Sequence, residues 1–316
     1  MTDKMTAQAA LDRLETLYQQ SVANLRAAVK TFLDTGERPS AEARAGGLFA
    51  YPELRVSWFG DRPAHLAIRS YARLSRPGVY ATTVTRPELF RPYLTEQLRL
   101  LEEDYGAAFE VRPSQQEIPF PYVMDGSDVV LDPSNTAAIA RHFPTTDLAH
   151  IGDEVSDGLF DVAEDFPLAQ FDGLRTDFSL ARLRHYTGTP VEHVQSYILF
   201  TNYNRYVDEF VRWALVQLAD PDSPYDSLST PGGVIVTRDT ADPEAAIAES
   251  AWKKHQMPAY HLTAPGWNGI SLVNIGVGPS NAKTICDHLA VTRPHAWMMI
   301  GHCGGLRDSQ TVGDYV

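Results

Sequence analysis

The sequence predicts an α/β protein in two parts, an α+β domain over residues 1–180 and an α/β domain with a mostly parallel sheet over residues 181–316. In the first half, strands and helices are expected without a regular order, whereas beyond residue 190 they alternate. Regular alternation is typical of a parallel sheet covered by helices. Two glycine turns also directly follow apolar, β-rich runs near the end of the chain, which fits the same class.

The first element of the N-terminal half is an amphipathic helix. Its apolar residues recur at spacings of three and four, which places them on one helical face; they are Leu11, Leu14, Tyr18, Val22, Leu25, Val29 and Phe32. Gly36 and Pro39 end this helix. The other elements expected in this half are strands over 54–59, 79–85 and 107–112 and a helix over 92–105. Pro92 suits the first turn of that helix.

Between residues 113 and 185, prolines divide the chain into short pieces and acidic residues cluster. The clustered residues are Asp153, Glu154, Asp157, Asp161, Glu164 and Asp165. They lack the D-x-[DN]-x-[DN]-G pattern of a calcium loop, so a solvated acidic connection is favoured over a calcium site. The histidines show no spacing typical of zinc ligands. We therefore assign no metal site.

Beyond residue 190 the expected elements alternate regularly. They are strands over 194–200, 233–237, 270–275 and 296–300 and helices over 206–218, 242–254 and 280–290. Asp242 is a good N-cap, and Pro243 suits the first helical position. In α/β sheets, ligands bind beyond the carboxyl ends of the strands. Both glycine turns follow such ends.

Composition and charge limit the possible functions. With 44% apolar and 21% charged residues, the chain is typical of soluble globular proteins. Its net charge of −13 argues against a nucleic-acid surface, which needs a basic face. We expect no membrane span, because no uninterrupted apolar run approaches about 18 residues. The polar N-terminus shows no secretory signal, and the two cysteines have no metal or redox spacing, so we expect a cytoplasmic protein.

The two glycine turns indicate an anion site. The first is Gly276-Val-Gly278, and the second contains His302, Cys303, Gly304 and Gly305. A strand followed by a glycine turn and a helix directs backbone N–H groups toward an anion at the helix N-terminus. Two such turns at neighbouring strand ends would form a site for a phosphate and a sugar. The alternative for the first turn is a plain strand–turn–helix connection.

Two better-known glycine motifs do not fit the first turn. A dinucleotide fingerprint has a third glycine where this chain has Asn281, and the P-loop spacing is absent. A dinucleotide-dependent oxidoreductase is therefore disfavoured.

Several stretches of the chain resemble the nucleoside phosphorylase and nucleosidase superfamily, and more specifically the bacterial AMP nucleosidases. They are GLFAYP at 47–52, IPFPY at 118–122, RLRHYTGTP at 182–190, LFTNY at 199–203, RYVDEF at 205–210, AWKKHQMP at 251–258, NIGVGPSNAKTICDHL at 274–289 and IGHCGGL at 300–306. The resemblance covers essentially the whole chain. Residues 181–316 then resemble the first part of a nucleoside phosphorylase-like domain.

This resemblance implies hydrolysis of the N-glycosidic bond of AMP to adenine and D-ribose 5-phosphate. It also implies a homo-oligomer, a hexamer in this family, and an N-terminal domain concerned with regulation. MgATP is the implied activator and inorganic phosphate the implied inhibitor, whereas the chemistry itself requires no cofactor. AMP is thus the expected partner, with no nucleic acid and no membrane.

The resemblance also suggests roles for individual residues. Asn281 and Met299 stand where phosphorolytic relatives have phosphate-binding arginines, so water is the expected nucleophile. Asn281 is itself expected to contact the substrate, together with Gly276 and Gly278 of the first turn. His302 replaces a ligand-binding serine and is expected to contact water or ribose; the alternative is a buried histidine that shapes the turn. Tyr203 and Arg205 could reach the nucleotide phosphate, although Arg205 fits equally well as an ordinary exposed residue at a helix start.

Two further expectations concern the reacting groups. Cys303 fits a packing role better than that of a nucleophile, because no basic partner is visible to lower its pKa. In the relatives, the acid that protonates the leaving base lies later than the position of Val316, so the catalytic residue stays unknown and we expect no AMP cleavage by this chain alone. The alternative function is therefore a catalytically incomplete fragment, a nucleotide-binding, regulatory and assembly module.

Overall fold

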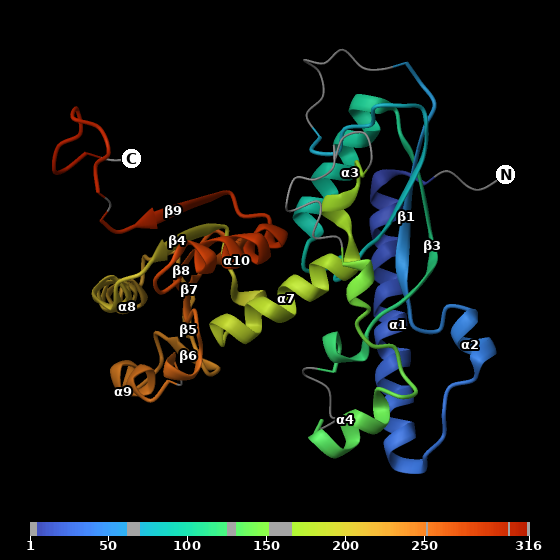
Figure 1. The fold of residues 1–316 in the computed structure, drawn as a ribbon, viewed down its shortest axis with the longest axis horizontal. Helices are drawn as coiled ribbons and strands as arrows, with labels where there is room; N and C mark the ends of the chain where they lie inside the picture. The colour runs from blue at the N-terminus through green and yellow to red at the C-terminus, as the bar shows by residue number, and fades with distance from the viewer. Residues whose placement is uncertain are drawn as a thin grey trace. The chain divides into compact units, whose positions relative to one another are not determined.

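The computed structural model describes residues 5–61, 70–124, 131–151, 166–250, 252–302 and 304–314. The chain divides into two compact units, unit 1 (Met1–Ala181) and unit 2 (Arg182–Val316) (Figure 1). The sequence predicted a boundary between residues 180 and 181, and the structure divides the chain between residues 181 and 182. The acidic cluster between residues 153 and 165 lies outside the described residues, so the structure says nothing about a calcium site there.

Unit 1 is built on the long helix α1 (Ala7–Thr35). Its N-cap is Thr6, whose side chain accepts a hydrogen bond from the N–H of Ala9. It ends at Gly36, which adopts a φ of 77° and donates its N–H to the carbonyl of Phe32. Glycine reaches this left-handed conformation without the steric cost that a Cβ atom imposes. The helix and its end at Gly36 are confirmed.

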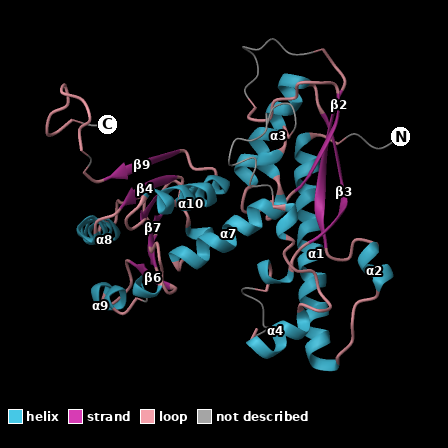
Figure 2. Cartoon of the chain, in the orientation of Figure 1, coloured by secondary structure: helices cyan, strands magenta, loops and turns pink. Residues whose placement is uncertain are grey.

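A three-stranded antiparallel sheet packs with α1 in unit 1 (Figure 2). Its strands are β1 (Ala50–Trp58), β2 (Gly78–Thr83) and β3 (Ala108–Glu117), in the order β2-β1-β3. Helix α3 (Arg91–Tyr105) begins with a proline in its first turn, as expected. The core between α1, α3 and this sheet includes Leu14, Leu54, Trp58 and Leu98. The α+β character expected for this half is confirmed.

Shorter helices complete the described part of the chain. Two short α-helices of unit 1 are α2 (Ala41–Ala45) and α4 (Pro133–Ile139). Single 3-10 turns span Phe120–Tyr122, Leu148–His150, Ala169–Phe171, Val191–His193, Trp252–Lys254, Pro265–Trp267 and Ala290–Thr292. Among the described residues, no helix is both long enough and apolar enough to span a membrane.

Helix α7 (Gly173–Thr187) was not expected from the sequence and crosses the boundary between the units. Its buried Asp177 accepts hydrogen bonds from Tyr51 Oη at 2.7 Å and from Thr85 Oγ1 at 2.9 Å. Arg86 Nε lies 3.4 Å from the same carboxylate. Burial raises the pKa of Asp177, and the arginine opposes that shift. Because polar residues face the core here, the apolar periodicity that marks a helix is weak.

Unit 2 contains a six-stranded sheet in the order β6-β5-β7-β8-β4-β9. Its strands are β4 (Tyr197–Thr201), β5 (Ser227–Thr230), β6 (Val234–Thr237), β7 (Ala259–Thr263), β8 (Ile270–Asn274) and β9 (Ala296–Ile300). The α/β class is confirmed. The expectation of a mostly parallel sheet is wrong, because only β8, β4 and β9 run parallel, whereas β6, β5, β7 and β8 pair antiparallel.

The antiparallel part arises from two strands that the sequence did not reveal, β5 and β7. A short turn with Gly232 and Gly233, both at positive φ, joins β5 to β6. Another short connection joins β7 to β8. Short turns suit antiparallel neighbours, whereas parallel strands need a long crossover. Helix α10 (Pro279–Leu289) lies in the crossover that carries the chain from β8 to β9.

Helix α8 (Asn204–Ala219) covers one face of the sheet in unit 2. Its Val207, Phe210, Ala214 and Leu218 are buried in a common core with Leu262 and other residues of the sheet. Helix α9 (Pro243–Ala248) starts at the expected N-cap Asp242. It ends six residues before Lys254, the end expected from the sequence, because the chain turns into the 3-10 segment at Trp252–Lys254.

Strand β9 is the exposed edge of this sheet (Figure 1). Among the described strands it pairs with β4 only, and residues 296–299 are exposed along it on both faces. Trp297 and Met298 are 46% and 65% exposed. The strand was predicted at this position, and in the structure most of its side chains are exposed.

Candidate functional site

The candidate site lies at the carboxyl edge formed by β8, β4 and β9. These parallel strands end in register, since Thr201 is paired with Asn274 on one side and with Ile300 on the other. The loops that follow the three strands therefore leave the sheet at the same edge. The sequence predicted that the two glycine turns follow neighbouring strands. This prediction is wrong, because β4 lies between β8 and β9.

The first glycine turn, after β8, is closed by its own side chains. Gly276 and Gly278 adopt φ of 63° and 115°, which glycine favours. Asn274 Oδ1 accepts the N–H of Gly276 at 3.1 Å, and Asn281 Nδ2 donates to the carbonyl of Ile275 at 3.0 Å. The Asn281 amide is thus used to fix the turn, which differs from the ligand contact expected for it. Helix α10 begins after Gly278 with no side-chain cap.

The loop after β4 adds a second helix start at the same edge. Tyr203 donates its N–H to Thr201 Oγ1 at 3.2 Å, and α8 begins at Asn204 with no side-chain cap. Asn274 Nδ2 donates to Asn204 Oδ1 at 2.8 Å, which ties this loop to β8. Two helix N-termini at one edge, with Arg205 in the first turn of α8, favour the binding of an anion.

The structure brings three of the expected residues together, Tyr203, Arg205 and His302. The His302 ring centroid lies 5.7 Å from that of Tyr203 and 6.2 Å from that of Tyr206. The Arg205 guanidinium carbon lies 5.2 Å from the Tyr206 ring centroid. His302 is exposed, so its alternative interpretation as a buried histidine is wrong. The sequence predicted Tyr206 only as the first residue of a helix over 206–218 and not as part of the site.

One orphaned polar atom lies beside this group. Asn202 Oδ1 is buried without a hydrogen-bond partner among the described residues. A Cβ atom at Gly301 would lie 3.6 Å from it and 3.5 Å from the Tyr203 ring, so the second glycine turn passes close to the β4 loop. A buried acceptor of this kind calls for a donor from water or a ligand.

Gly304 and Gly305 of the second glycine turn are not brought into this group. Cys303 lies outside the described residues. A Cβ atom at Gly304 would meet nothing within 4 Å, and one at Gly305 would meet only Gln310. Gln310 Oε1 accepts the N–H groups of Leu306 and Arg307 at 2.8 and 3.0 Å, which makes this segment a local turn of its own.

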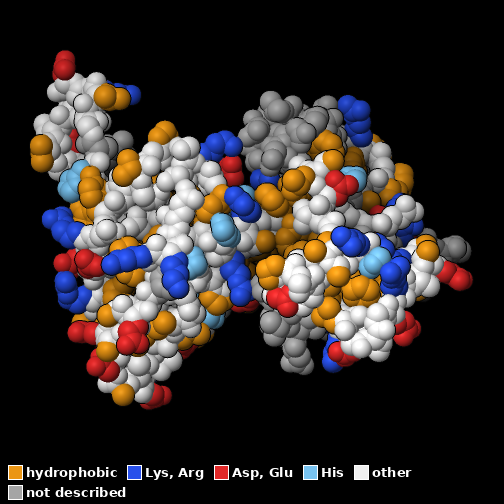
Figure 3. Space-filling model, turned by 60° about the horizontal axis from the view of Figure 1, so that its bottom comes forward, with side chains coloured by type: hydrophobic (Ala, Val, Ile, Leu, Met, Phe, Trp, Pro, Cys, Tyr) orange, Lys and Arg blue, Asp and Glu red, His pale blue; other side chains and the backbone are white. Residues whose placement is uncertain are grey.

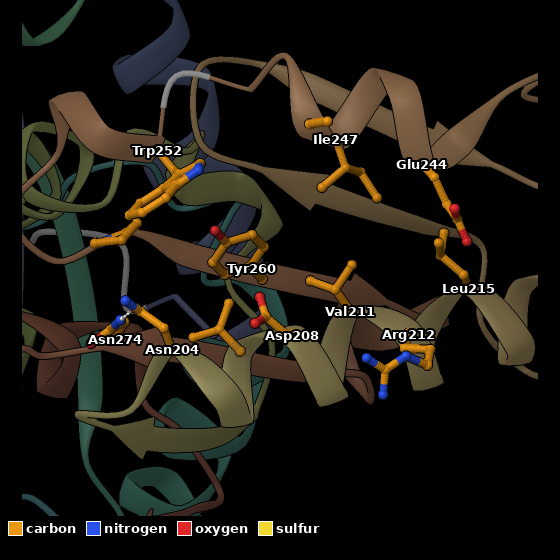
Figure 4. Close-up of a pocket in the computed structure, with 13 residues that line it drawn as sticks. Asn204, Asp208, Val211, Arg212, Leu215, Glu244, Ile247, Trp252, Tyr260 and Asn274 are labelled. Carbon is orange, nitrogen blue, oxygen red and sulfur yellow. Dashed lines mark hydrogen bonds between the residues drawn. The ribbon is translucent and has the colours of Figure 1, made fainter.

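A pocket of about 600 Å³ adjoins the edge between α8 and α9 (Figure 4). It is lined by Asn204, Val207, Asp208, Val211, Arg212, Leu215, Glu244, Ile247, Ala248, Trp252, Pro258, Tyr260 and Asn274. Burial and the nearby charge of Asp208 raise the pKa of Tyr260 to about 12, so its hydroxyl stays protonated. The pocket therefore offers a hydroxyl donor and a carboxylate acceptor. The spacing of its α8 residues resembles an ordinary core stripe, which is why sequence inspection missed it.

No metal-ligand cluster of three or more His, Cys, Asp or Glu residues occurs within the described ranges. On the face shown in Figure 3, Lys and Arg side chains are interspersed with Asp and Glu. An anion at the candidate site would therefore be held by local helix ends and Arg205, because the net charge of −13 is repulsive overall.

The family comparison decides the affiliation of the chain. A sequence model described as "Bacterial AMP nucleoside phosphorylase N-terminus" matches residues 9–167, about half of the chain. The chain belongs to this family. The matched residues lie in unit 1, so the family match by itself does not cover the candidate site.

Two curated relatives match both units of the chain. AMP nucleosidases of Escherichia coli K12 and O157:H7 are each 60% identical to the chain over 312 residues, which is 99% of this chain. The chain spans 64% of the length of these relatives. A solved AMP nucleosidase from Bacteroides thetaiotaomicron VPI-5482 is 24% identical, covering 42% of this chain and 40% of that one, with a TM-score of 0.27.

Proposed function

We propose that the protein is an AMP nucleosidase. Water attacks the anomeric carbon of AMP, the bond from that carbon to the adenine nitrogen breaks, and adenine leaves with a proton while ribose 5-phosphate gains the hydroxyl. The observation that carries this proposal is the 60% identity over 312 residues to the E. coli enzymes named AMP nucleosidase. A shared activity is the simplest reason for such identity across both units.

The carboxyl edge of unit 2 supports the proposal chemically. Arg205 and the start of α8 would hold the phosphate, because a guanidinium and free backbone N–H groups are strong donors to phosphate oxygens. Tyr203, Gly276, Gly278 and His302 would line the ribose and the attacking water. Asn281 would keep its turn-closing role.

Water, and not phosphate, is proposed as the nucleophile. Asn281 and Met299 occupy the positions at which the resemblance places arginines in phosphorolytic relatives. Met299 lies on the exposed strand β9, and the Asn281 amide is bonded within its turn. Neither side chain supplies a guanidinium to clamp a second phosphate.

The cellular location, the assembly and the regulatory ligands are proposed from the resemblance to the AMP nucleosidases. We propose a cytoplasmic homo-hexamer in which residues 1–180 carry regulation by MgATP as activator and inorganic phosphate as inhibitor. Neither the assembly nor these regulatory ligands enters the argument for the reaction.

Adenine release in excess inorganic phosphate tests the proposed reaction. The assay compares the 316-residue chain with a chimera that continues into the part of the E. coli enzyme that this chain does not match. We expect the chimera to give adenine and ribose 5-phosphate, identified by phosphorus NMR. Ribose 1,5-bisphosphate as the main product would contradict hydrolysis. AMP binding without adenine release from the chimera would favour the nucleotide-binding module instead.

A further inference from the structure

Tyr206 is the residue that links the two basic side chains of the candidate site. It lies in the first turn of α8, and its N–H donates to the carbonyl of Tyr203 at 3.1 Å. The Arg205 guanidinium carbon is 5.2 Å from its ring centroid, and the His302 ring centroid is 6.2 Å away at an interplanar angle of 32°. Arg205 belongs to α8, whereas His302 follows β9, so one ring contacts groups from two elements.

Tyr203 also packs against the Tyr206 ring. The Tyr203 and Tyr206 rings lie 5.6 Å apart at 86°, an edge-to-face arrangement that aromatic pairs favour. Tyr203 also contacts His302, with ring centroids 5.7 Å apart at 82°. The three rings therefore form a cluster in which each contacts the other two. Tyr206 is half-buried, whereas Tyr203, Arg205 and His302 are exposed.

Such a ring restrains side chains that are otherwise free to move. An exposed arginine samples many rotamers, and a guanidinium near an aromatic face is attracted to the ring quadrupole. His302 lies on a loop beyond the strand end, so its imidazole also needs a rigid neighbour to keep one orientation. A regular helix supplies that neighbour, because the backbone of Tyr206 is fixed by α8.

We propose that Tyr206 is a positioning residue that holds the Arg205 guanidinium and the His302 imidazole toward one bound phosphate monoester. The ligand class rests on the proposed function, because the sugar phosphate is the part of AMP that a guanidinium recognises. The restraint itself is a property of the free protein. Its essential part is the aromatic ring, so phenylalanine should replace tyrosine and an aliphatic side chain should not.

The first experiment tests the restraint without ligand. Histidine and arginine side-chain resonances are compared by NMR in the 316-residue chain and in Tyr206→Leu and Tyr206→Phe. We expect Tyr206→Leu to move the His302 and Arg205 signals, because the ring current of Tyr206 is lost, and Tyr206→Phe to leave them near their original positions. Unchanged His302 and Arg205 signals in Tyr206→Leu would overturn the proposal.

A matched control lies at the opposite end of the sheet edge, where β4 begins at Tyr197 and His295 precedes β9. Tyr197 packs against His295 with ring centroids 5.8 Å apart at 84°, also in an edge-to-face pair. Tyr197→Leu should move the His295 signal and leave that of His302 in place. A His302 signal that moves equally in both leucine variants would indicate a general loosening of unit 2 and would contradict the specific role.

The second experiment measures ribose 5-phosphate binding by calorimetry. We expect Tyr206→Leu to weaken binding about tenfold, which is about 1.4 kcal/mol, and Tyr206→Phe to change it less than twofold. Equal binding by the original protein and Tyr206→Leu would overturn the proposal, as would equal weakening by phenylalanine and leucine. If Tyr206→Leu does not fold, Tyr206→Met removes the ring with a side chain of similar length.

The two experiments separate the two proposals. If the original protein and its chimera both fail to bind ribose 5-phosphate, the proposed function loses its site, while the ligand-free resonances still decide whether Tyr206 restrains His302. If ligand binds and those resonances do not respond to Tyr206→Leu, the positioning role fails and the proposed function stands.

Discussion

Two histidines of the same sheet differ completely in their surroundings. His261 on β7 lies in the antiparallel part and is 1% exposed, whereas His302 follows the edge strand β9 and is exposed. Thr189 Oγ1 lies 2.8 Å from His261 Nε2, and Ser271 Oγ lies 2.7 Å from its Nδ1. Burial and cross-strand partners make His261 part of the core, while His302 is exposed beyond the end of a strand.

The polar groups around His261 are also hydrogen-bonded to one another. Ser271 Oγ accepts the N–H of Gln195 at 2.8 Å, and His193 Nδ1 lies 2.9 Å from Ser229 Oγ. Gln195 Oε1 accepts the N–H of Gly269 at 3.1 Å. Buried polar groups in a complete network stabilise one arrangement, whereas the open edge leaves Asn202 Oδ1 for water or a ligand. The difference is therefore one between a structural use of histidine at His261 and the functional use that we propose for His302.

Acid should destabilise the closed region around His261. Burial, helped by the charge of His193, lowers the pKa of His261 from 6.5 to about 3. The unfolded chain then binds a proton below pH 6.5 that the folded chain refuses, so the free energy of unfolding should fall as pH drops from about 6.5 toward 3, by up to about 5 kcal/mol. Denaturation of His261→Gln over this pH range is the control, and an equally steep fall in that variant would assign the effect elsewhere.

Truncation of His302 should affect function and not folding. His302→Ala in the chimera should lower AMP turnover about 100-fold, about 3 kcal/mol in activation free energy, because a donor to the reacting region is lost. The melting temperature should stay unchanged, since the side chain is exposed. His295→Ala, at the opposite end of β9, is the matched control and should leave turnover unchanged. A lower melting temperature with normal kinetics would instead support a packing role for His302.

Leu272 and Met298 test whether the exposed strand β9 is less tightly packed than the buried strand β8. Leu272 on β8 and Met298 on β9 both pair with Leu199 of β4, but they are 1% and 65% exposed. Leu272→Ala should lower the free energy of unfolding by about 3 kcal/mol, because it leaves a cavity. Met298→Ala should change it by less than about 0.5 kcal/mol. Urea denaturation measures both, and comparable losses would show that β9 is as well packed as β8.

The smallest expected effects come from two glycines. A Cβ atom at Gly269 would lie 2.1 Å from the carbonyl oxygen of Leu262, so Gly269→Ala must displace backbone and should destabilise the fold by about 2 kcal/mol. Gly304 has open space around it, and Gly304→Ala should be neutral within about 0.5 kcal/mol. Thermal melts of both variants provide the check, and a destabilising Gly304→Ala would mean that the second glycine turn is more tightly packed than the structure shows.

Sequence inspection succeeded where the signal was local. The apolar period of α1, the N-cap Asp242 and the strand at 270–275 were all predicted near their observed positions. It failed at β5 and β7, which are short and mix Ser, Thr and His with apolar residues. It also failed at α7, where the buried Thr176, Asp177 and Ser179 hide the period of the helix.

The candidate site was predicted in its parts and not in its arrangement. The glycine turns, Tyr203, Arg205 and His302 are visible in the sequence because strand ends and turn glycines have local signals. The grouping of Tyr203, Arg205 and His302 around Tyr206 is not visible, because it requires β4 to lie between β8 and β9. Asn281 was expected to face the ligand, and its bond to Ile275 emerges only from the folded turn.

Local signals in the sequence are enough to place the turns of this chain, several of its helices and the residues that could meet an anion, because backbone preference and side-chain period act over a few neighbouring residues. The tertiary structure alone decided that the sheet is mixed, that His261 is enclosed between Thr189 and Ser271, and that His302 rests against two tyrosines. Strand order and burial depend on contacts between distant parts of the chain. For that reason a histidine's role is set by the neighbours that the fold brings to it.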